Sequence, residues 1–257
     1  MAAFSFYFIL FFGSSFVFQQ TSSQVSVASG NPVSNCRAAT SRAPGPPPGG
    51  RPGQRSPNCS VRSGQCMTTQ CVEEGPYYKA CSPLEQMGGQ FLPQVCTNSA
   101  RNDRLFINGT VRLVDASSPC GRPVRALLDI WHADAVGVYS NTSPASRDFT
   151  CRKRLITTSA GFFAYSTIMP GRYGTGRSEG YRATHVHVKV TPLDQNNNII
   201  GPTLTTQQYF AHDLYAGAKD QCNECHSEDP TLVVYPQHSY DVKTYDGTWD
   251  ILLPRMS

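Results

Sequence analysis

Residues 185–190 read HVHVKV, and this strict alternation of side chains constrains the fold more than any other feature of the chain. Neighbouring side chains of a β-strand point to opposite faces, so the three valines share one face and the two histidines share the other. We therefore expect a strand whose valines enter a hydrophobic core. His185 and His187 then lie side by side on the opposite face.

Short apolar segments separated by turn residues continue this pattern from about Leu105 onward. The chain has 21 glycines and 19 prolines, which favour turns and argue against a helical bundle. Only residues 211–218 show a weak helical period. We expect an all-β fold with an antiparallel β-sandwich core, and a strand–turn–strand unit around residues 159–161. The expected strands lie within residues 124–130, 154–157, 161–168, 185–190, 199–210 and 248–253.

The N-terminal 23 residues carry no Lys, Arg, Asp or Glu, and residues 4–18 are almost continuously apolar. This run is shorter than the ~20 residues that span a bilayer. It predicts a secretory signal peptide at residues 1–23, the alternative being a single N-terminal anchor helix. We expect a secreted, extracellular protein with no stable membrane insertion once the signal peptide is cleaved.

Ten cysteines fit this address, because an even number in an oxidising compartment predicts up to five disulfides. Their pairing cannot be deduced from the sequence. Residues 222–226 read CNECH, which matches the attachment pattern of haem c. In a secreted chain rich in cysteine, an ordinary disulfide is the favoured interpretation.

Residues 24–70 form an extension rich in Cys, Pro, Gly and Arg, before a domain at residues 71–257. Residues 44–53 read PGPPPGGRPG and cannot bury a core, so we expect a flexible, disulfide-linked segment. Five arginines precede the first acidic residue, Glu73. This tail either holds the protein on an anionic polysaccharide or membrane surface, or is simply solvated. The overall charge of +4 is too small to indicate nucleic-acid binding.

Two imidazoles on one strand are half of a metal site for iron, copper, zinc or nickel. The alternative is that His185 and His187 are two polar residues on a solvated face. Two nearby segments each carry a tyrosine: DIWHADAVGVYS contains Tyr139 and PGRY contains Tyr173. Spacing alone would not select these tyrosines, because tyrosine is common in strands.

Four sequence blocks occur in the order found in intradiol ring-cleavage dioxygenases. The blocks are LLDIWHADAVGVYS, MPGRY, YRATHVHV and TQQYF. The chain resembles the secreted eukaryotic members of this family, which includes catechol 1,2- and protocatechuate 3,4-dioxygenases. The resemblance extends from about Glu74 to the C-terminus, and it says nothing about the residues before Cys71.

The resemblance implies that four side chains bind one non-haem Fe(III) per chain. Fe(III) is a hard ion, and two phenolates are hard anionic donors that stabilise it. A free phenol has a pKa near 10, so the metal must displace both phenol protons. The implied ligands are Tyr139, Tyr173, His185 and His187.

Further roles follow from the same resemblance. Arg182 is implied to bind the substrate and to stabilise charge on the attacked ring, although an arginine at a strand edge is otherwise usually solvated. Tyr173 is implied to leave the metal and take up a substrate proton. Gln207 is implied to support catalysis, its alternative being a solvated polar residue. Pro76 and Tyr77 are implied to line the substrate pocket.

The function implied by the resemblance is cleavage of a catechol by O2 between its two hydroxyl-bearing carbons, with both oxygen atoms incorporated. The product is a diacid of the cis,cis-muconate type. We expect a monomer, since this chain has a cysteine-rich region and a proline-rich linker where the bacterial members of the family have N-terminal segments that build oligomers. One alternative is a non-catalytic secreted module that binds aromatics or glycans, and another is copper on the histidine pair.

Overall fold

The computed structural model describes residues 62–63, 66–97, 103–143, 145–174, 180–238 and 243–254. Residues 62 and 63 are described as backbone only. The expected signal peptide and almost all of the expected extension lie outside these residues, so the boundaries at residues 23 and 70 stay predictions. Within the described part of the chain, no helix has the length and apolar character needed to cross a bilayer.

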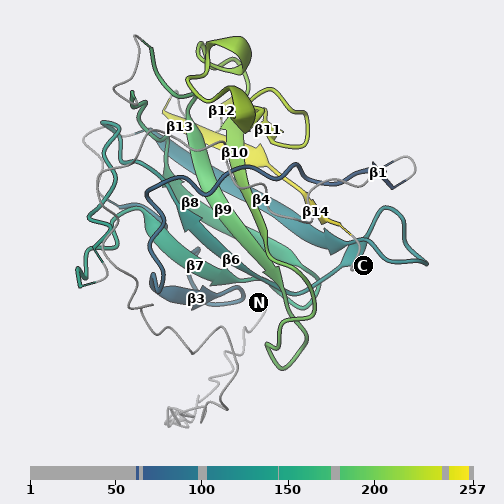
Figure 1. Ribbon diagram of the computed structural model, residues 1–257. Coiled ribbons are helices and arrows are strands. Elements are labelled where there is room, and N and C mark those ends of the chain that lie inside the picture. Colours follow the sequence, from purple (N-terminus) through teal and green to yellow (C-terminus); the bar gives the residue numbers. More distant parts are fainter. Residues whose placement is uncertain are drawn as a thin grey trace, which may run out of the picture.

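Two six-stranded sheets dominate the described residues (Figure 1). The first has the order β11-β10-β9-β6-β7-β3, and the second is the path β12-β13-β4-β14, to which β5 and β8 add by pairing with β4. The strands of the first sheet are β3 (Leu84–Gln86), β6 (Ala126–Trp131), β7 (Arg152–Ile156), β9 (His185–Pro192), β10 (Leu204–Phe210) and β11 (Val233–Val234). Those of the second are β4 (Arg104–Leu113), β5 (Arg122–Pro123), β8 (Phe162–Ile168), β12 (Gln237–His238), β13 (Thr244–Thr248) and β14 (Ile251–Leu253).

Short elements complete the described structure. β1 (Arg62–Ser63) pairs with β2 (Cys66–Met67), and two short 3-10 helices, η1 (Gly217–Lys219) and η2 (Asn223–Cys225), follow β10. The weak helical period of residues 211–218 therefore corresponds to turns and η1, and it does not produce an α-helix.

The central strand pairs are antiparallel, which confirms the predicted all-β sandwich. β6 pairs antiparallel with β7 and β9, β9 with β10, and β4 with β8. Parallel pairs also occur: β3 with β7, β10 with β11, and both β13 and β14 with β4. The sequence did not predict these parallel pairs, because strand direction depends on contacts between distant segments.

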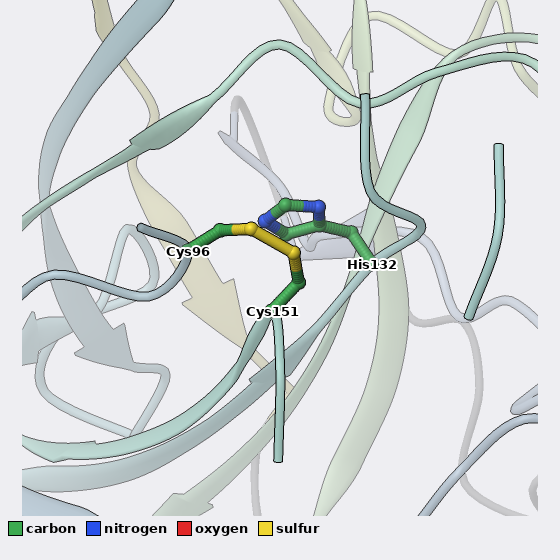
Figure 2. A group of neighbouring side chains, drawn as sticks. All are labelled: Cys96, His132 and Cys151. Atoms are coloured by element: carbon green, nitrogen blue, oxygen red, sulfur yellow. A yellow bond between two sulfur atoms is a disulfide. The ribbon is translucent and has the colours of Figure 1, made fainter. Parts of the chain in front are cut away.

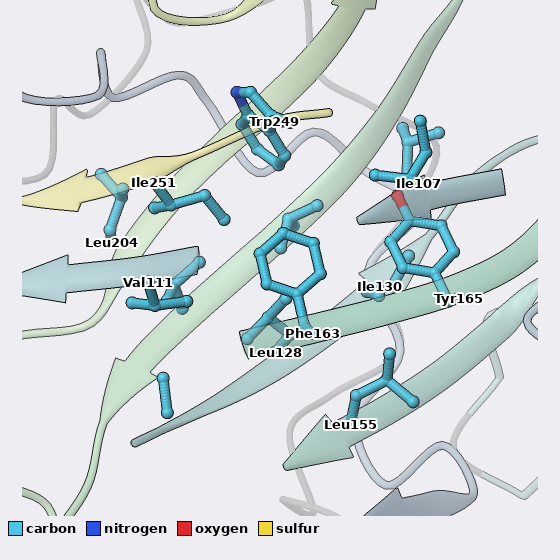
Figure 3. Packing of buried hydrophobic residues seen from close by; sticks show 14 of the residues in the cluster. Ile107, Val111, Leu128, Ile130, Leu155, Phe163, Tyr165, Leu204, Trp249 and Ile251 are labelled. Atoms are coloured by element: carbon cyan, nitrogen blue, oxygen red, sulfur yellow. The ribbon is translucent and has the colours of Figure 1, made fainter. Parts of the chain in front are cut away.

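The main hydrophobic core lies between the two sheets (Figure 3). The first sheet contributes Leu128, Ile130, Leu155, Val186, Val188 and Val190, and the second contributes Leu105, Ile107, Val111, Phe163, Tyr165 and Ile251. All three valines of β9 are thus in the core, as the alternation predicts. The opposite face of β9 is free to carry polar side chains.

The strand–turn–strand prediction for residues 154–168 is correct for the strands but wrong for their pairing. β7 and β8 lie in different sheets, and the chain crosses between the sheets at the turn. Gly161 permits the crossing, because its φ of +74° is left-handed and a Cβ there would lie 2.4 Å from the carbonyl oxygen of Val111. A local pattern of alternation cannot distinguish a hairpin from such a crossing.

Disulfides link several of the described segments. The pairs are Cys66–Cys120, Cys96–Cys151 and Cys222–Cys225, and Cys71 and Cys81 are disulfide-bonded as well. No cysteine among the described residues is free. Disulfide use of the cysteines, including the C-x-x-C pair, is as the sequence predicts.

Gly109 in β4 lies opposite the short connection between β13 and β14, which both pair with β4. A Cβ at this position would lie 1.9 Å from the carbonyl oxygen of Trp249. The backbone N–H of Trp249 donates to the carbonyl of Asn108. We predict that Gly109→Ala lowers the free energy of unfolding by about 2–3 kcal/mol, because backbone would have to move. Urea denaturation measures this, with Gly89→Ala as the control.

Gly89 has no heavy atom nearer than 3.9 Å to a built Cβ, so its substitution should change stability by no more than about 0.5 kcal/mol. Equal effects of the two substitutions would contradict the close approach at Gly109.

Candidate metal centre

The outer face of the first sheet carries a row of side chains across four strands. His187 on β9 lies opposite Gln207 on β10 and Trp131 on β6, and Trp131 in turn lies opposite Arg152 on β7. The indole of Trp131 stacks on the imidazole of His187, with ring centroids 4.8 Å apart and planes inclined by 5°. The end of this row with Gln207 and His187 forms the floor of a buried polar site.

His185 and His187 face each other through their Nε2 atoms, which are 3.2 Å apart. The Nδ1 of His185 lies 2.5 Å from the carbonyl oxygen of Ala183, and since a carbonyl can only accept, Nδ1 carries the proton. Burial lowers the pKa of His185 to about 3 and that of His187 well below its ordinary value. Both imidazoles are therefore neutral, and the Nε2 of His185 presents a lone pair.

Tyr139 and Tyr173 bring two phenols to these imidazoles. The Oη of Tyr173 lies 3.4 Å from the Nε2 of His185, and the rings of the two tyrosines meet edge to face with centroids 5.4 Å apart. The Oη of Tyr139 is buried and makes no hydrogen bond of good geometry with any described residue. Burial is the main reason why the pKa of each phenol is raised. The structure thus brings the four predicted ligands together.

Two glycines allow the loops that carry the tyrosines to pack against each other. A Cβ on Gly137 would lie 2.2 Å from the carbonyl oxygen of Arg172, and one on Gly171 would lie 2.4 Å from the N–H of Gly137. The N–H of Gly171 donates to the carbonyl of Asp134 at 2.8 Å. These contacts explain why glycine occurs in both AVGVY and PGRY.

Arg182 is buried beside the phenol of Tyr173. Its Nε donates to Asp220 at 2.7 Å, and its Nη2 donates to the side-chain oxygen of Gln207 at 3.1 Å and to the hydroxyl of Tyr209 at 3.3 Å. Its Nη1 lies 3.5 Å from the Oη of Tyr173. Arg182 and Gln207 are thus buried and hydrogen-bonded, so neither is a solvated strand residue. Asp220 was missed from the sequence, because only the fold brings it to Arg182.

The segment at residues 73–78 covers the site. The ring of Tyr77 stacks on that of Tyr139, with centroids 4.4 Å apart and an angle of 12°. Gly75 has a φ of +69°, and a Cβ there would lie 3.5 Å from the imidazole of His187. Pro76 is exposed, whereas Tyr77 is partly buried. The segment therefore brings Tyr77 into the site and leaves Pro76 at its surface.

A second group of side chains of types that can bind a metal lies elsewhere (Figure 2). It consists of Cys96, His132 and Cys151. Its two sulfur atoms form a disulfide and are not available as thiolates. The imidazole is also engaged, because Nδ1 lies 2.7 Å from the carbonyl of Ala133 and Nε2 lies 2.7 Å from the hydroxyl of Thr167. This group is structural.

The same reasoning applies to Glu73, Cys222 and Cys225, a further group of this kind in the described residues. The two cysteines are disulfide-bonded, and the carboxylate of Glu73 lies 3.8–3.9 Å from their sulfur atoms. The group offers no thiolate, to a metal or to a haem.

Comparison with known proteins agrees with the fold and the site. A family model described as "Dioxygenase" matches residues 73–255. Chlorocatechol 1,2-dioxygenase of Rhodococcus opacus is 28% identical over an alignment of 209 residues that covers 75% of this chain and 73% of that protein. The protocatechuate 3,4-dioxygenase beta chain of Burkholderia cepacia is 30% identical over an alignment of 166 residues that covers 55% of this chain and 66% of that one.

Solved structures show the same similarity. The dioxygenase domain of a dioxygenase carbohydrate-binding protein fusion from Streptomyces sp. SirexAA-E has a TM-score of 0.54 and 28% identity, over 73% of this chain and 99% of that one. Catechol 1,2-dioxygenase from Acinetobacter sp. ADP1 has a TM-score of 0.59 and 26% identity, over 74% and 63%. The chain belongs to the intradiol ring-cleavage dioxygenase family.

Asp129 of β6 is a buried carboxylate on the face of the first sheet that carries His187. It accepts hydrogen bonds from the hydroxyl of Tyr78 at 2.9 Å and from that of Ser82 at 3.2 Å. The bond from Tyr78 holds the covering segment to the sheet, and the bond from Ser82 holds the chain just after it. Burial raises the pKa of Asp129 to about 6, against the opposing effects of these donors and of Arg154.

This shift predicts a pH dependence of stability. A carboxyl whose pKa is higher in the folded state binds its proton preferentially there, so its contribution to stability falls as pH rises from about 4 to about 6. Asp129→Asn cannot ionise, so acidification from pH 7 to pH 4 should stabilise the wild type relative to the variant by about 2–3 kcal/mol. Denaturation of both proteins at each pH measures the difference, and a difference independent of pH would contradict it.

Proposed function

We propose that this protein is a secreted, non-haem Fe(III) intradiol dioxygenase. It cleaves catecholic aromatics with O2 to diacids of the cis,cis-muconate type. Membership of the family supports the class of reaction, and the iron, the catechol and the secretion are what the proposal adds. The observation that carries it is the convergence of two phenols and two neutral imidazoles on one buried face of the sheet.

The chemistry of this donor set supports ferric iron. Two phenolates are hard anionic donors, and imidazole is accepted by iron as well as by copper and zinc. The Oη of Tyr139, buried without a hydrogen bond, and the Nε2 lone pair of His185 would both be satisfied by a shared cation. Iron bound by Tyr139, Tyr173, His185 and His187 would supply the redox chemistry by drawing electron density from a catecholate.

The remaining side chains orient and stabilise the substrate. Arg182 holds a desolvated positive charge beside the Oη of Tyr173, which favours an anionic catecholate there. Gln207 and Asp220 fix the guanidinium from two sides. Tyr173 is the proposed ligand whose phenol contacts Arg182, and we assign it the uptake of a catechol proton at Oη. Tyr77 covers the site and helps exclude water.

Secretion is supported by two features. The N-terminal apolar run has the form of a signal peptide, and disulfides link the described segments. The proposed partners are a small catecholic substrate and O2, with a monomer as the working form. A non-catalytic module that binds aromatics or glycans is the alternative, and the following experiments distinguish it.

We predict that the purified protein from an iron-replete host is red-brown and contains one iron per chain. Phenolate-to-iron charge transfer gives this colour. His187→Ala should lose the iron, the colour and the ring cleavage, because the other donors cannot complete the site. Metal analysis, the visible spectrum and oxygen uptake with catechol measure these properties.

The control for this substitution is His238→Ala, which removes an exposed histidine on β12 and should change none of them. Wild-type protein that is colourless and iron-free would defeat the proposal. Copper at one per chain would support the alternative metal, and catechol binding without turnover would support a binding module.

Arg182 should matter for the rate rather than for iron binding. Arg182→Gln alone would leave Asp220 as an unpaired buried charge, at a cost of about 3–5 kcal/mol in stability. We therefore predict the effect for the double variant Arg182→Gln/Asp220→Asn, which removes both charges. Its kcat should fall about 100- to 1000-fold while its iron content and colour remain. A kcat within a fewfold of the wild type would contradict the assigned role.

A further inference from the structure

Arg152 on β7 is a buried cation at the end of the row that contains His187. The residue is only 2% exposed, and it lies opposite Trp131, whose indole stacks on His187. Arg154, two residues along β7 on the same face, lies opposite Asp129 instead. The two arginines therefore share a strand, a face and a buried setting, but only Arg154 has a carboxylate as its cross-strand neighbour.

All three nitrogen atoms of the Arg152 guanidinium donate to neutral acceptors. Nε donates to the hydroxyl of Ser140 at 2.6 Å, Nη2 to the carbonyl of Ser140 at 3.3 Å, and Nη1 to the carbonyl of Tyr77 at 2.7 Å. Within the described residues no carboxylate forms an ion pair with Arg152. This is unusual, because buried charges in proteins are nearly always paired.

These acceptors flank the two stacked tyrosines of the site. Ser140 directly follows Tyr139, and the ring of Tyr77 lies 4.4 Å from that of Tyr139 and 5.9 Å, edge on, from that of Tyr173. The guanidinium is a planar fork with fixed donor directions, so it holds its acceptors in one relative position. One side chain therefore joins the covering segment to the loop that carries Tyr139.

We propose that Arg152 is a positioning residue that sets the place of the Tyr139 phenol and supplies the positive charge beside it. The inference rests on the proposed function, in which Tyr139 is a metal-binding phenolate. A buried guanidinium whose hydrogen-bond acceptors are all neutral stabilises a nearby anion. In the proposed function, this anion is the phenolate of Tyr139. Arg152 acts through Ser140 and Tyr77, without touching substrate or metal.

Arg154 provides the matched control. It is 8% exposed, and its Nε donates to the carbonyl of Ser82 at 2.8 Å, so it holds the chain just after the covering segment to the sheet. Loss of either arginine removes a buried guanidinium from β7. Only loss of Arg152 should disturb the loop that carries Tyr139.

The experiment compares Arg152→Gln, Arg152→Lys and Arg154→Gln in the full chain. Each variant is examined for thermal midpoint without metal, for affinity for Fe(III), and for the position and intensity of the charge-transfer band. Both glutamine variants should have lower midpoints. Arg152→Gln alone should also shift and weaken the band and bind iron about 10- to 100-fold more weakly, as loss of a residue that orients a ligand does. Arg152→Lys keeps the charge and should restore part of the band.

Ser140→Ala keeps the inference testable if Arg152→Gln does not fold. It removes the hydroxyl that accepts from Nε and leaves the arginine in place, so it should shift the band in the same direction by a smaller amount. Identical bands and iron affinities in the Arg152→Gln and Arg154→Gln proteins, or an unchanged Ser140→Ala band, would overturn the inference while leaving the proposed function intact. A wild type without iron or band would overturn the proposed function itself.

Discussion

Burial of Val186, Val188 and Val190 between the two sheets determines where the histidines of β9 point. Burying three valines contributes on the order of 5 kcal/mol. A slip of one residue in the pairing of β9 would move all three valines to the polar face and turn both imidazoles into the apolar core, so the register is strongly specified. The metal centre thus takes its rigidity from the core beneath it.

The tyrosines have no such strand to hold them, since both lie in loops. Their positions depend on close approach of backbone at Gly137 and Gly171, and on two buried guanidinium groups. Arg182 is paired with Asp220 and contacts Tyr173, whereas Arg152 bonds to Ser140 beside Tyr139. Each loop is therefore held by an arginine: Arg152 lies in β7, and Arg182 lies just before β9. Such an arrangement keeps a polar site ordered where water is excluded, because every nitrogen of each guanidinium donates at least one hydrogen bond.

The sequence predicts what depends on neighbouring residues. The alternation in residues 185–190 places the valines and histidines correctly, and the turn at Gly161 is found where it was expected. It does not predict that β7 and β8 belong to different sheets, or that β13 and β14 run parallel to β4, since these depend on contacts far apart in the chain. The tyrosines were identified by resemblance and not by spacing, because each lies in a loop with no periodic pattern.

The roles of the residues that support the site could not be predicted from the sequence for the same reason. Asp220, which lies 38 positions after Arg182 in the chain, is brought to it by the fold, and Arg152 reaches Tyr77 across 75 positions. In the sequence both look like ordinary charged residues. Their roles become visible only as buried hydrogen bonds in the structure.

Resonance Raman spectroscopy of the purified protein, excited within its visible absorption band, tests the central claim most directly. The account predicts enhanced tyrosinate vibrations from two distinct phenolates, one set lost in Tyr139→Phe and the other in Tyr173→Phe. A metal-loaded protein whose visible spectrum carries no tyrosinate vibrations would contradict it, because the two phenols and the two imidazoles would then not share one ion.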